Sequence, residues 1–170
     1  MLRSLRFGIE NLEQGLVRWI DRHGADAMRW AFGIVFLWFG VLKLWPGLCD
    51  VEALAAKTVG MLTFGLVPMR GCILMLAALE MWIGASLLLN KGVRLGCWLL
   101  VGHLLGTFIP LMMFPADAWK HFPYAPTLTG QYILKNLILV SAALLVAAKA
   151  LRRGEGQLVE MPQRVERSVA

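Results

Sequence analysis

Four ionisable residues lie within the apolar stretches of this sequence, and their side chains could support ligand binding and proton transfer. They are Lys43, Glu80, His103 and Lys135, one in each stretch. Charged groups inside a bilayer are costly, so they usually face the protein interior and pair with one another. A carboxylate and an imidazole can move protons, so we predict catalytic roles for Glu80 and His103. An ammonium group can polarise a ligand oxygen, and we predict that Lys43, Lys135 and Gln131 bind the ligand.

Four apolar stretches must position these residues, and together they define the fold class. The sequence has 170 residues, of which 58% are hydrophobic, and its mean hydropathy is +0.64. Each stretch is long enough, or nearly so, to cross a hydrocarbon core of about 30 Å as a helix. The predicted spans are residues 28–46, 71–89, 93–114 and 131–149. We therefore predict an all-α, polytopic membrane protein with an antiparallel four-helix bundle over residues 27–150.

The segments outside the four spans are predicted to lie at the membrane surface or in solvent. Residues 1–26 place Leu12 and Leu16 on one helical face, which is typical of an amphipathic interfacial helix. A helical extension of the first span into the cytosol fits the same residues equally well. The short turn at residues 90–92 predicts that the second and third helices form an antiparallel hairpin. Residues 151–170 are polar, and we predict that they form a disordered cytoplasmic tail.

The distribution of basic residues predicts the orientation in the membrane. Lys and Arg are frequent before the first span, between the second and third spans, and after the fourth, and they are fewer on the other side. Because basic loops stay in the cytoplasm, both termini are predicted to be cytoplasmic. The formal net charge of +6 therefore indicates a preference for anionic lipid surfaces. The sequence contains no nucleic-acid-binding motif, so the lipid bilayer is the predicted partner and nucleic acid is not.

Small residues share helical faces with the ionisable residues, which indicates that these faces pack against other helices. Lys43 shares its face with Gly33, Phe36 and Gly40. Glu80 shares its face with Ile73, Ala77 and Gly84. His103 shares its face with Gly92, Gly96, Gly106 and Pro110. Small side chains allow helix backbones to approach closely. We predict a pocket that opens on the outer side of the membrane, in which Glu80 pairs with Lys43 or Lys135.

Each of these residues also has a simpler interpretation. Lys43 and Lys135 could extend their ammonium groups to the outer headgroups. Glu80 could be a structural partner that fixes the helix register. His103 could only hydrogen-bond to a neighbouring helix. No second metal ligand lies four residues from His103, so no metal site is predicted.

Two of the three cysteines flank the outer ends of the first two spans. Cys49 and Cys72 would close the first outer loop if an oxidising compartment allowed a disulfide between them. Cys97 lies near the inner end of the third span, out of their reach. Two separate thiols are the alternative interpretation, because the pair lacks a C-x-x-C spacing.

Four segments of the sequence form a recognisable set, namely FLWFGVLKL, LEMWIGASLLL, TFIPLMMFPADAW and LTGQYILKNLILVSAALL. In this order they resemble the DoxX-like superfamily of small bacterial membrane proteins. They include Gly40 and Lys43 in the first span and Glu80 in the second. A Gly-Gln-Tyr-hydrophobic-Leu-Lys sequence opens the fourth span (130–135). The resemblance covers about residues 27–148 and is greatest to the branch that contains the reactive-chlorine-resistance inner-membrane protein, although the first outer loop, WPGLCDVEALAAK, departs from that branch.

The resemblance implies a multi-pass protein of the bacterial inner membrane. Relatives are associated with quinone-linked thiosulfate oxidation, with oxidoreductase complexes that handle oxidative stress, and with receptor assembly in animals. One hypothesis is a redox-linked component that binds a quinone or a small oxidant-derived molecule and works with a membrane or periplasmic oxidoreductase. The alternative is a non-catalytic scaffold or assembly factor, and a homo-oligomer is compatible with either. Small-solute transport has less support, because the sequence shows neither inverted repeats nor broken helices.

Overall fold

Four long apolar helices dominate the structure, which is a computed structural model. It describes residues 2–48 and 52–169, and it describes side chains for residues 10–48 and 53–152. Helices contain 81% of the residues. The described stretches that are long and apolar enough to cross a membrane are Glu10–Leu42, Met69–Leu89, Val93–Met113 and Leu128–Arg152. The prediction of a mostly helical chain with four helices long and apolar enough to cross a membrane is confirmed.

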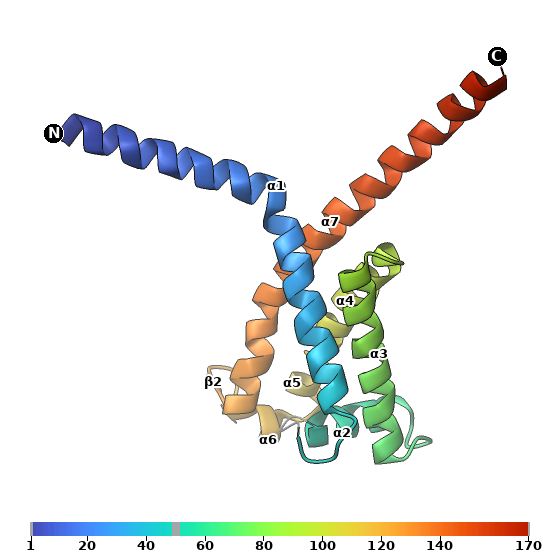
Figure 1. Ribbon diagram of the computed structural model, residues 1–170. Helices are drawn as coiled ribbons and strands as arrows, with labels where there is room; N and C mark the ends of the chain where they lie inside the picture. Colours follow the sequence, from blue (N-terminus) through green and yellow to red (C-terminus); the bar gives the residue numbers. More distant parts are fainter. Residues whose placement is uncertain (1, 49–51, 170) are drawn as a thin grey trace.

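The elements follow one another along the chain as Figure 1 shows. They are α1 (Leu2–Leu42), α2 (Glu52–Leu62), α3 (Met69–Leu89), α4 (Val93–Gly106), α5 (Ile109–Met113), α6 (Pro115–Ala118), β1 (Trp119–His121), β2 (Ala125–Pro126) and α7 (Leu128–Val169). β1 and β2 pair in antiparallel fashion, with Trp119 opposite Pro126. This two-stranded hairpin is a local departure from the predicted all-α fold, and it lies between α6 and α7.

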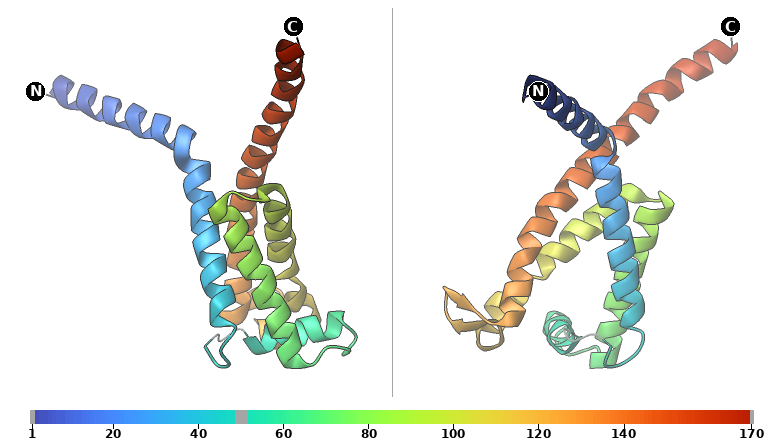
Figure 2. Two further views of the ribbon diagram at one scale, coloured as in Figure 1. Left: turned by 45° about the vertical axis from the view of Figure 1, so that its right-hand side comes forward. Right: turned by 60° about the vertical axis from the view of Figure 1, so that its left-hand side comes forward.

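The four long helices contact one another in a ring. α1 packs against α3 and α7, and α4 also packs against α3 and α7. Both ends of the chain project from one end of the ring, which we call the terminal end (Figures 1 and 2). α2 and the β1–β2 hairpin lie at the other end, which we call the α2 end. α2 packs there against α3 and α5.

Glycines allow α1 and α3 to approach closely. A Cβ atom added to Gly84 would lie 2.5 Å from the backbone N of Leu37. One added to Gly40 would lie 2.8 Å from the backbone N of Met81. Because backbone atoms cannot yield as a flexible side chain can, only glycine fits at these two positions. The close contact sets the distance between side chains that lie one turn further along each helix.

The third apolar stretch is interrupted, so its helix ends earlier than predicted. α4 ends at Gly106 and α5 begins at Ile109, with Pro110 in the first turn of α5. Proline lacks a backbone N–H, and its ring clashes with the carbonyl of the residue four positions earlier, here Gly106. The predicted helix 93–114 is therefore two helices, and the break lies one turn after His103.

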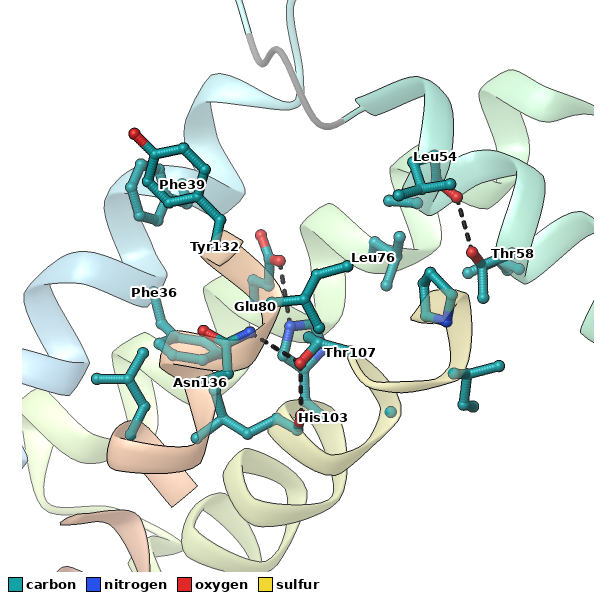
Figure 3. Close-up of a pocket in the computed structure, with 18 of the residues that line it drawn as sticks. Phe36, Phe39, Leu54, Thr58, Leu76, Glu80, His103, Thr107, Tyr132 and Asn136 are labelled. Carbon is teal, nitrogen blue, oxygen red and sulfur yellow. Dashed lines mark hydrogen bonds and ion pairs between the residues drawn. The ribbon is translucent and has the colours of Figure 1, made fainter. Parts of the chain in front are cut away.

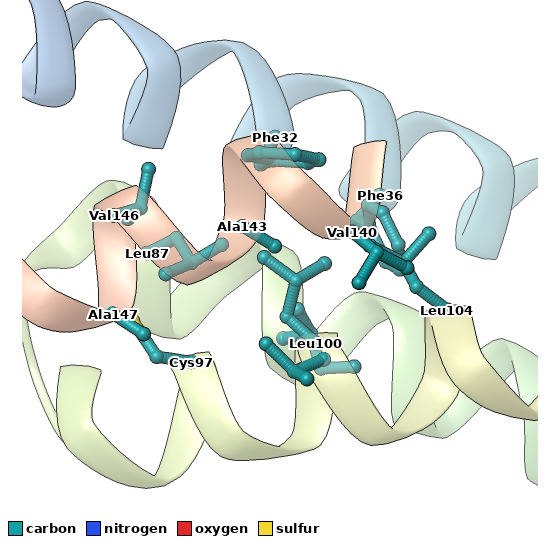
Figure 4. Packing of buried hydrophobic residues seen from close by; sticks show 12 residues of the cluster. Phe32, Phe36, Leu87, Cys97, Leu100, Leu104, Val140, Ala143, Val146 and Ala147 are labelled. Atoms are coloured by element: carbon teal, nitrogen blue, oxygen red, sulfur yellow. The ribbon is translucent and has the colours of Figure 1, made fainter. Parts of the chain in front are cut away.

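A hydrophobic core lies between α1, α3, α4 and α7, and Figure 4 shows most of its members packed together. Its buried residues are Phe32, Phe36, Ile83, Leu87, Cys97, Leu100, Val101, Leu104, Val140, Ala143, Val146 and Ala147. Many large apolar side chains are exposed instead, among them Trp38, Leu137 and Ile138. Lipid solvates such side chains as well as a protein core does, so their exposure agrees with a bilayer environment.

The two ends of the chain are long helices. α1 is continuous from Leu2 to Leu42 and changes direction partway along (Figure 1). Its first part is thus helical, as both interpretations of residues 1–26 require. α7 continues to Val169, so the segment 151–169, predicted to be disordered, is helical in the structure. The sequence of this segment has acidic and basic residues three or four positions apart, a spacing that favours a helix.

Candidate functional site

A cavity of about 490 Å³ lies at the α2 end, with walls from α1, α2, α3, α4, α5 and α7. Most of its lining is apolar. The apolar residues include Val35, Phe36, Phe39, Leu54, Val59, Leu62, Leu76, Leu104, Ile109, Ile133 and Leu139. The polar ones are Lys43, Thr58, Glu80, His103, Thr107, Thr129, Tyr132 and Asn136. Figure 3 shows many of these side chains around the space, Glu80 and His103 among them, and the combination of apolar walls with a few convergent polar groups is typical of small-molecule sites.

Lys43 and Glu80 form a buried ion pair at one wall of the cavity. Lys43 Nζ donates a hydrogen bond to Glu80 Oε2 at 2.6 Å. Only 6% of the Lys43 side chain and 9% of the Glu80 side chain are exposed. Mutual pairing offsets the cost of removing each charge from water, and loss of either partner would leave the other uncompensated. Of the two lysines expected near Glu80, Lys43 is the one that the structure places there.

His103 approaches the other oxygen of the same carboxylate. Its Nε2 lies 3.4 Å from Glu80 Oε1, and Figure 3 shows the two side chains pointing toward each other. The ring of Phe36 packs edge-on against the imidazole, with 5.4 Å between the ring centroids. Glu80 therefore lies between an ammonium group and an imidazole, and a carboxylate and an imidazole can exchange protons with a ligand. The structure brings Lys43, Glu80 and His103 together as the sequence suggests, while their catalytic and binding roles stay predictions.

A second polar pair lies in another part of the cavity wall. Asn136 Nδ2 donates a hydrogen bond to Thr107 Oγ1 at 2.8 Å, and Thr107 Oγ1 donates to the backbone O of Leu104 at 2.6 Å. Thr107 follows the last residue of α4, so the interruption of the helix places its hydroxyl at the cavity. Sequence reasoning missed both residues. An amide side chain within an apolar stretch was the available signal, because such groups usually bond across helices.

Arg70 fixes the end of α1 that carries Lys43. Its guanidinium donates hydrogen bonds to the backbone O of Lys43 at 3.2 Å and to that of Leu44 at 2.5 Å. The last carbonyls of a helix have no N–H donor within the helix, and basic side chains often supply one. Lys43 is thus held through both its backbone and its side chain. Hydropathy and helical periodicity give no signal of this contact, which links the end of α1 to the start of α3.

Lys135 and Gln131 lie outside the cavity lining, which corrects the expectation that they join Glu80 at the site. Both side chains are exposed, and Lys135 Nζ lies over the ring of Tyr132, 4.7 Å from its centroid. Ile133 marks the buried face of α7. At about 100° per residue, Lys135 lies nearly opposite Ile133 around the helix axis. The exposed position of Lys135 is compatible with the simpler interpretation, in which its ammonium group extends to the outer headgroups.

The remaining predictions concern cysteines and metal binding. Cys72 is a buried free thiol, and its Sγ donates to the backbone O of Val67 at 3.5 Å. Its predicted disulfide partner, Cys49, lies outside the described residues. Cys97 is also a buried free thiol. Within the part of the chain that the structure describes, no group of three or more His, Cys, Asp or Glu side chains is placed to hold a metal ion.

The cavity has the chemistry to hold the polar end of a largely apolar molecule. A ligand oxygen next to the cluster would meet an ammonium donor in Lys43 and a proton-carrying pair in Glu80 and His103. The charges of Lys43 and Glu80 cancel, so the cluster with a neutral imidazole carries no net charge. Such a site does not demand a charged ligand.

Comparison of the chain with protein-family models, with curated proteins and with solved structures found no match. Function is therefore inferred from the chemistry of the cavity. The resemblance to the DoxX-like superfamily, drawn from short motifs, stays a hypothesis.

Proposed function

We propose that this chain is an inner-membrane protein that binds a quinone, or a similar small molecule with an apolar body and a polar oxygen, in the cavity at the α2 end. The observation that carries the proposal is the contact of Lys43 and His103 with one buried carboxylate, Glu80, at the wall of a mostly apolar cavity. The apolar walls suit a hydrophobic ring and tail, and the polar cluster suits a carbonyl or hydroxyl oxygen.

The four long helices would cross the bilayer as an antiparallel bundle, with both termini in the cytoplasm. This orientation has the support of the basic residues, which gather toward the terminal end, where both chain ends project (Figure 2). The α2 end then faces the periplasm. Leu12, Leu16, Trp19 and Ile20 are exposed in the first part of α1, so this part would lie along the cytoplasmic membrane surface.

The proposed reaction is proton-coupled oxidation or reduction of the bound quinone. Oxidation of a quinol to a quinone releases two protons and two electrons. Lys43 would hold one ligand oxygen, while Glu80 and His103 would each accept a proton. The two electrons would pass to a membrane or periplasmic oxidoreductase partner. Reduction of the quinone would use the same groups in the opposite direction.

We also propose that the chain is a DoxX-like protein with a role linked to oxidative stress. Lys43 and Glu80 belong to two of the motifs that carry the resemblance, and they form the buried ion pair. Gly40, which shares a motif with Lys43, lies where α1 and α3 approach closely. Motif residues from separate helices thus meet in one structural unit, which is what a common binding site would require.

The second candidate function is a non-catalytic scaffold or assembly factor. The β1–β2 hairpin favours it, because the side chains of Phe122 and Tyr124 are 71% and 77% exposed at the α2 end. Aromatic residues are enriched at protein–protein interfaces. In this case the pair of Lys43 and Glu80 would only fix the packing of α1 on α3.

Ligand binding by the full-length protein in lipid nanodiscs tests the first candidate. We expect saturable binding of a short-chain ubiquinone, weakened roughly tenfold or more in Glu80→Gln, because a hydrogen bond to a charged group contributes about 1.5–3 kcal/mol. Lys135→Gln is the matched control, since Lys135 is exposed and lies outside the cavity lining. Equal affinity in all three proteins would contradict the assignment of the site. Absence of saturable binding in the unaltered protein would favour the scaffold.

A further inference from the structure

A second cavity, of about 480 Å³, lies at the terminal end of the helices, away from the proposed quinone site. It is formed mainly by α1, the start of α4 and the middle of α7. The residues that line it are Ala25, Asp26, Arg29, Asn90, Gly92, Val93, Arg94, Leu95, Val146, Lys149 and Ala150. The proposed function gives this cavity no role.

Basic residues outnumber acidic ones in this cavity. Among the side chains that the structure describes, the ionisable ones that line it are Arg29, Arg94, Lys149 and a single carboxylate, Asp26. Lys149 Nζ lies 3.2 Å from Asp26 Oδ2, and Arg29 Nε lies 4.0 Å from Asp26 Oδ1. The carboxylate of Asp26 therefore lies near two cations, and Arg94 is a third cation in the cavity lining. The remaining positive charge favours an anion in the cavity.

Arg29 has hydrogen-bonding capacity that the described protein groups do not use. Its side chain is 12% exposed, and one of its terminal nitrogens donates to the backbone O of Leu87. Its Nε is buried and has no hydrogen-bond partner within the described part of the chain. A buried N–H of a charged group without an acceptor is costly, so an oxygen-bearing anion would be stabilised there.

The first turn of α4 adds backbone donors to the same cavity. Val93, Arg94 and Leu95 open this helix and line the cavity, and Gly92 before them supplies no side-chain cap. The N–H groups of a first helical turn have no acceptor within the helix, and the helix dipole favours negative charge at this end. The first turns of helices commonly bind phosphate groups, and here basic side chains lie around the first turn of α4.

We propose that the cavity at the terminal end binds a negatively charged phosphate group, supplied by the headgroup of an anionic phospholipid. The cavity lies at the ends of two helical stretches that are long enough to span a bilayer. Lys149 and Ala150 are close to Arg152, where one stretch ends, and Val93 is the first residue of the other. Headgroup phosphates lie at this depth. Lys and Arg side chains near an anionic leaflet strengthen lipid binding. The proposal does not depend on the quinone site at the α2 end.

Thermal unfolding of the full-length protein in neutral detergent tests this proposal. Phosphatidylglycerol, phosphatidylcholine or inorganic phosphate is titrated into the unaltered protein, Arg94→Gln and Lys91→Gln. Arg94 is exposed and lines the cavity, so its substitution should leave the fold intact. Lys91 is an exposed basic residue of the same turn that lies outside the lining, which makes it the matched control.

We expect phosphatidylglycerol to raise the melting temperature more than phosphatidylcholine does. The apparent Kd for phosphatidylglycerol should rise about fivefold in Arg94→Gln and stay unchanged in Lys91→Gln. Stabilisation by inorganic phosphate with the same dependence on Arg94 would support the phosphate site and identify free phosphate as a source. Equal shifts from the two lipids without a phosphate effect, or equal losses in the two variants, would overturn the proposal.

Discussion

The two cavities occupy opposite ends of the same helices and have similar volumes, about 490 and 480 Å³, but they differ in charge balance. At the α2 end, the carboxylate of Glu80 meets one ammonium group and one imidazole. At the terminal end, the described lining residues include three basic side chains and one carboxylate, that of Asp26. A balanced cluster with apolar walls suits the polar end of a neutral ligand, whereas an excess of cations suits an anion. The ratio of charges within a cavity therefore says more about its ligand than the presence of any one charged residue.

Removal of the Glu80 carboxylate should have the largest effect on stability, because it breaks the charge balance at the α2 end. Glu80→Leu leaves the ammonium group of Lys43 buried without a partner, and the loss of one member of a buried pair costs about 3–5 kcal/mol. The double variant Lys43→Met, Glu80→Leu should recover most of this free energy of unfolding. Unfolding in mixed micelles measures the free energy of unfolding of the single and the double variant. A cost below about 1 kcal/mol for Glu80→Leu would mean that the pair behaves as a surface ion pair.

A methyl group between α1 and α3 should have the next largest effect and should act on one cavity only. In Gly40→Ala the new Cβ would meet the backbone N of Met81, next to Glu80, at 2.8 Å, and such overpacking costs about 1–3 kcal/mol. Quinone affinity should fall with stability, while anionic-lipid binding at the terminal end should persist. Gly102→Ala is the control, since nothing lies within 4 Å of a Cβ at that position. Equal unfolding free energies for the two variants would be evidence against the close approach of α1 and α3.

Loss of the amide that crosses from α7 to α4 should have a smaller effect. Asn136→Leu removes the hydrogen bond to Thr107, and hydrogen bonds between membrane helices contribute on average about 0.6 kcal/mol. Ser141→Ala is a matched control on the same helix, because the exposed Ser141 hydroxyl donates a hydrogen bond within α7, to the backbone O of Leu137. The unfolding free energies of the two variants test this. An unchanged value in Asn136→Leu would remove this pair from the account of the cavity wall.

Substitution of Lys135 should have the smallest effect. Its ammonium group contacts the ring of Tyr132 at the surface, so Lys135→Gln should change the free energy of unfolding by less than about 0.5 kcal/mol. Quinone binding should be unaffected too. A loss of binding as large as that of Glu80→Gln would place Lys135 at the site after all, and with it an extra positive charge that would remove the contrast between the two cavities.

Helical periodicity was sufficient to predict which faces of the first two spans pack against other helices. Gly33, Gly40 and Lys43 share one face of the first span, and small residues there are hard to explain unless another backbone lies close. The same reasoning placed Glu80 on the packing face of the second span. These features were predictable because a glycine repeat and a single intramembrane charge are rare and point the same way.

The face of α7 could not be predicted in this way. Apolar residues surround most of this helix, because lipid and the protein interior both accept them, so hydropathy does not separate its two sides. Lys135 was therefore assigned inward, whereas Ile133 and Asn136 face the cavity. The break after Gly106 was predictable in principle, since Pro110 removes an intrahelical bond, but the sequence alone does not say whether a membrane helix bends or ends there.

Photocrosslinking is the most direct test of the claim that the cavity at the α2 end binds a quinone-like molecule. A photoreactive short-chain quinone is crosslinked to the full-length protein in nanodiscs, and the modified residues are mapped by mass spectrometry. We predict labels on cavity-lining residues such as Leu76 and Ile133, reduced by excess ubiquinone and lost in the double variant Lys43→Met, Glu80→Leu. Labels confined to exposed residues of α7 such as Leu137 and Ile138, or labels that excess ubiquinone does not reduce, would contradict it.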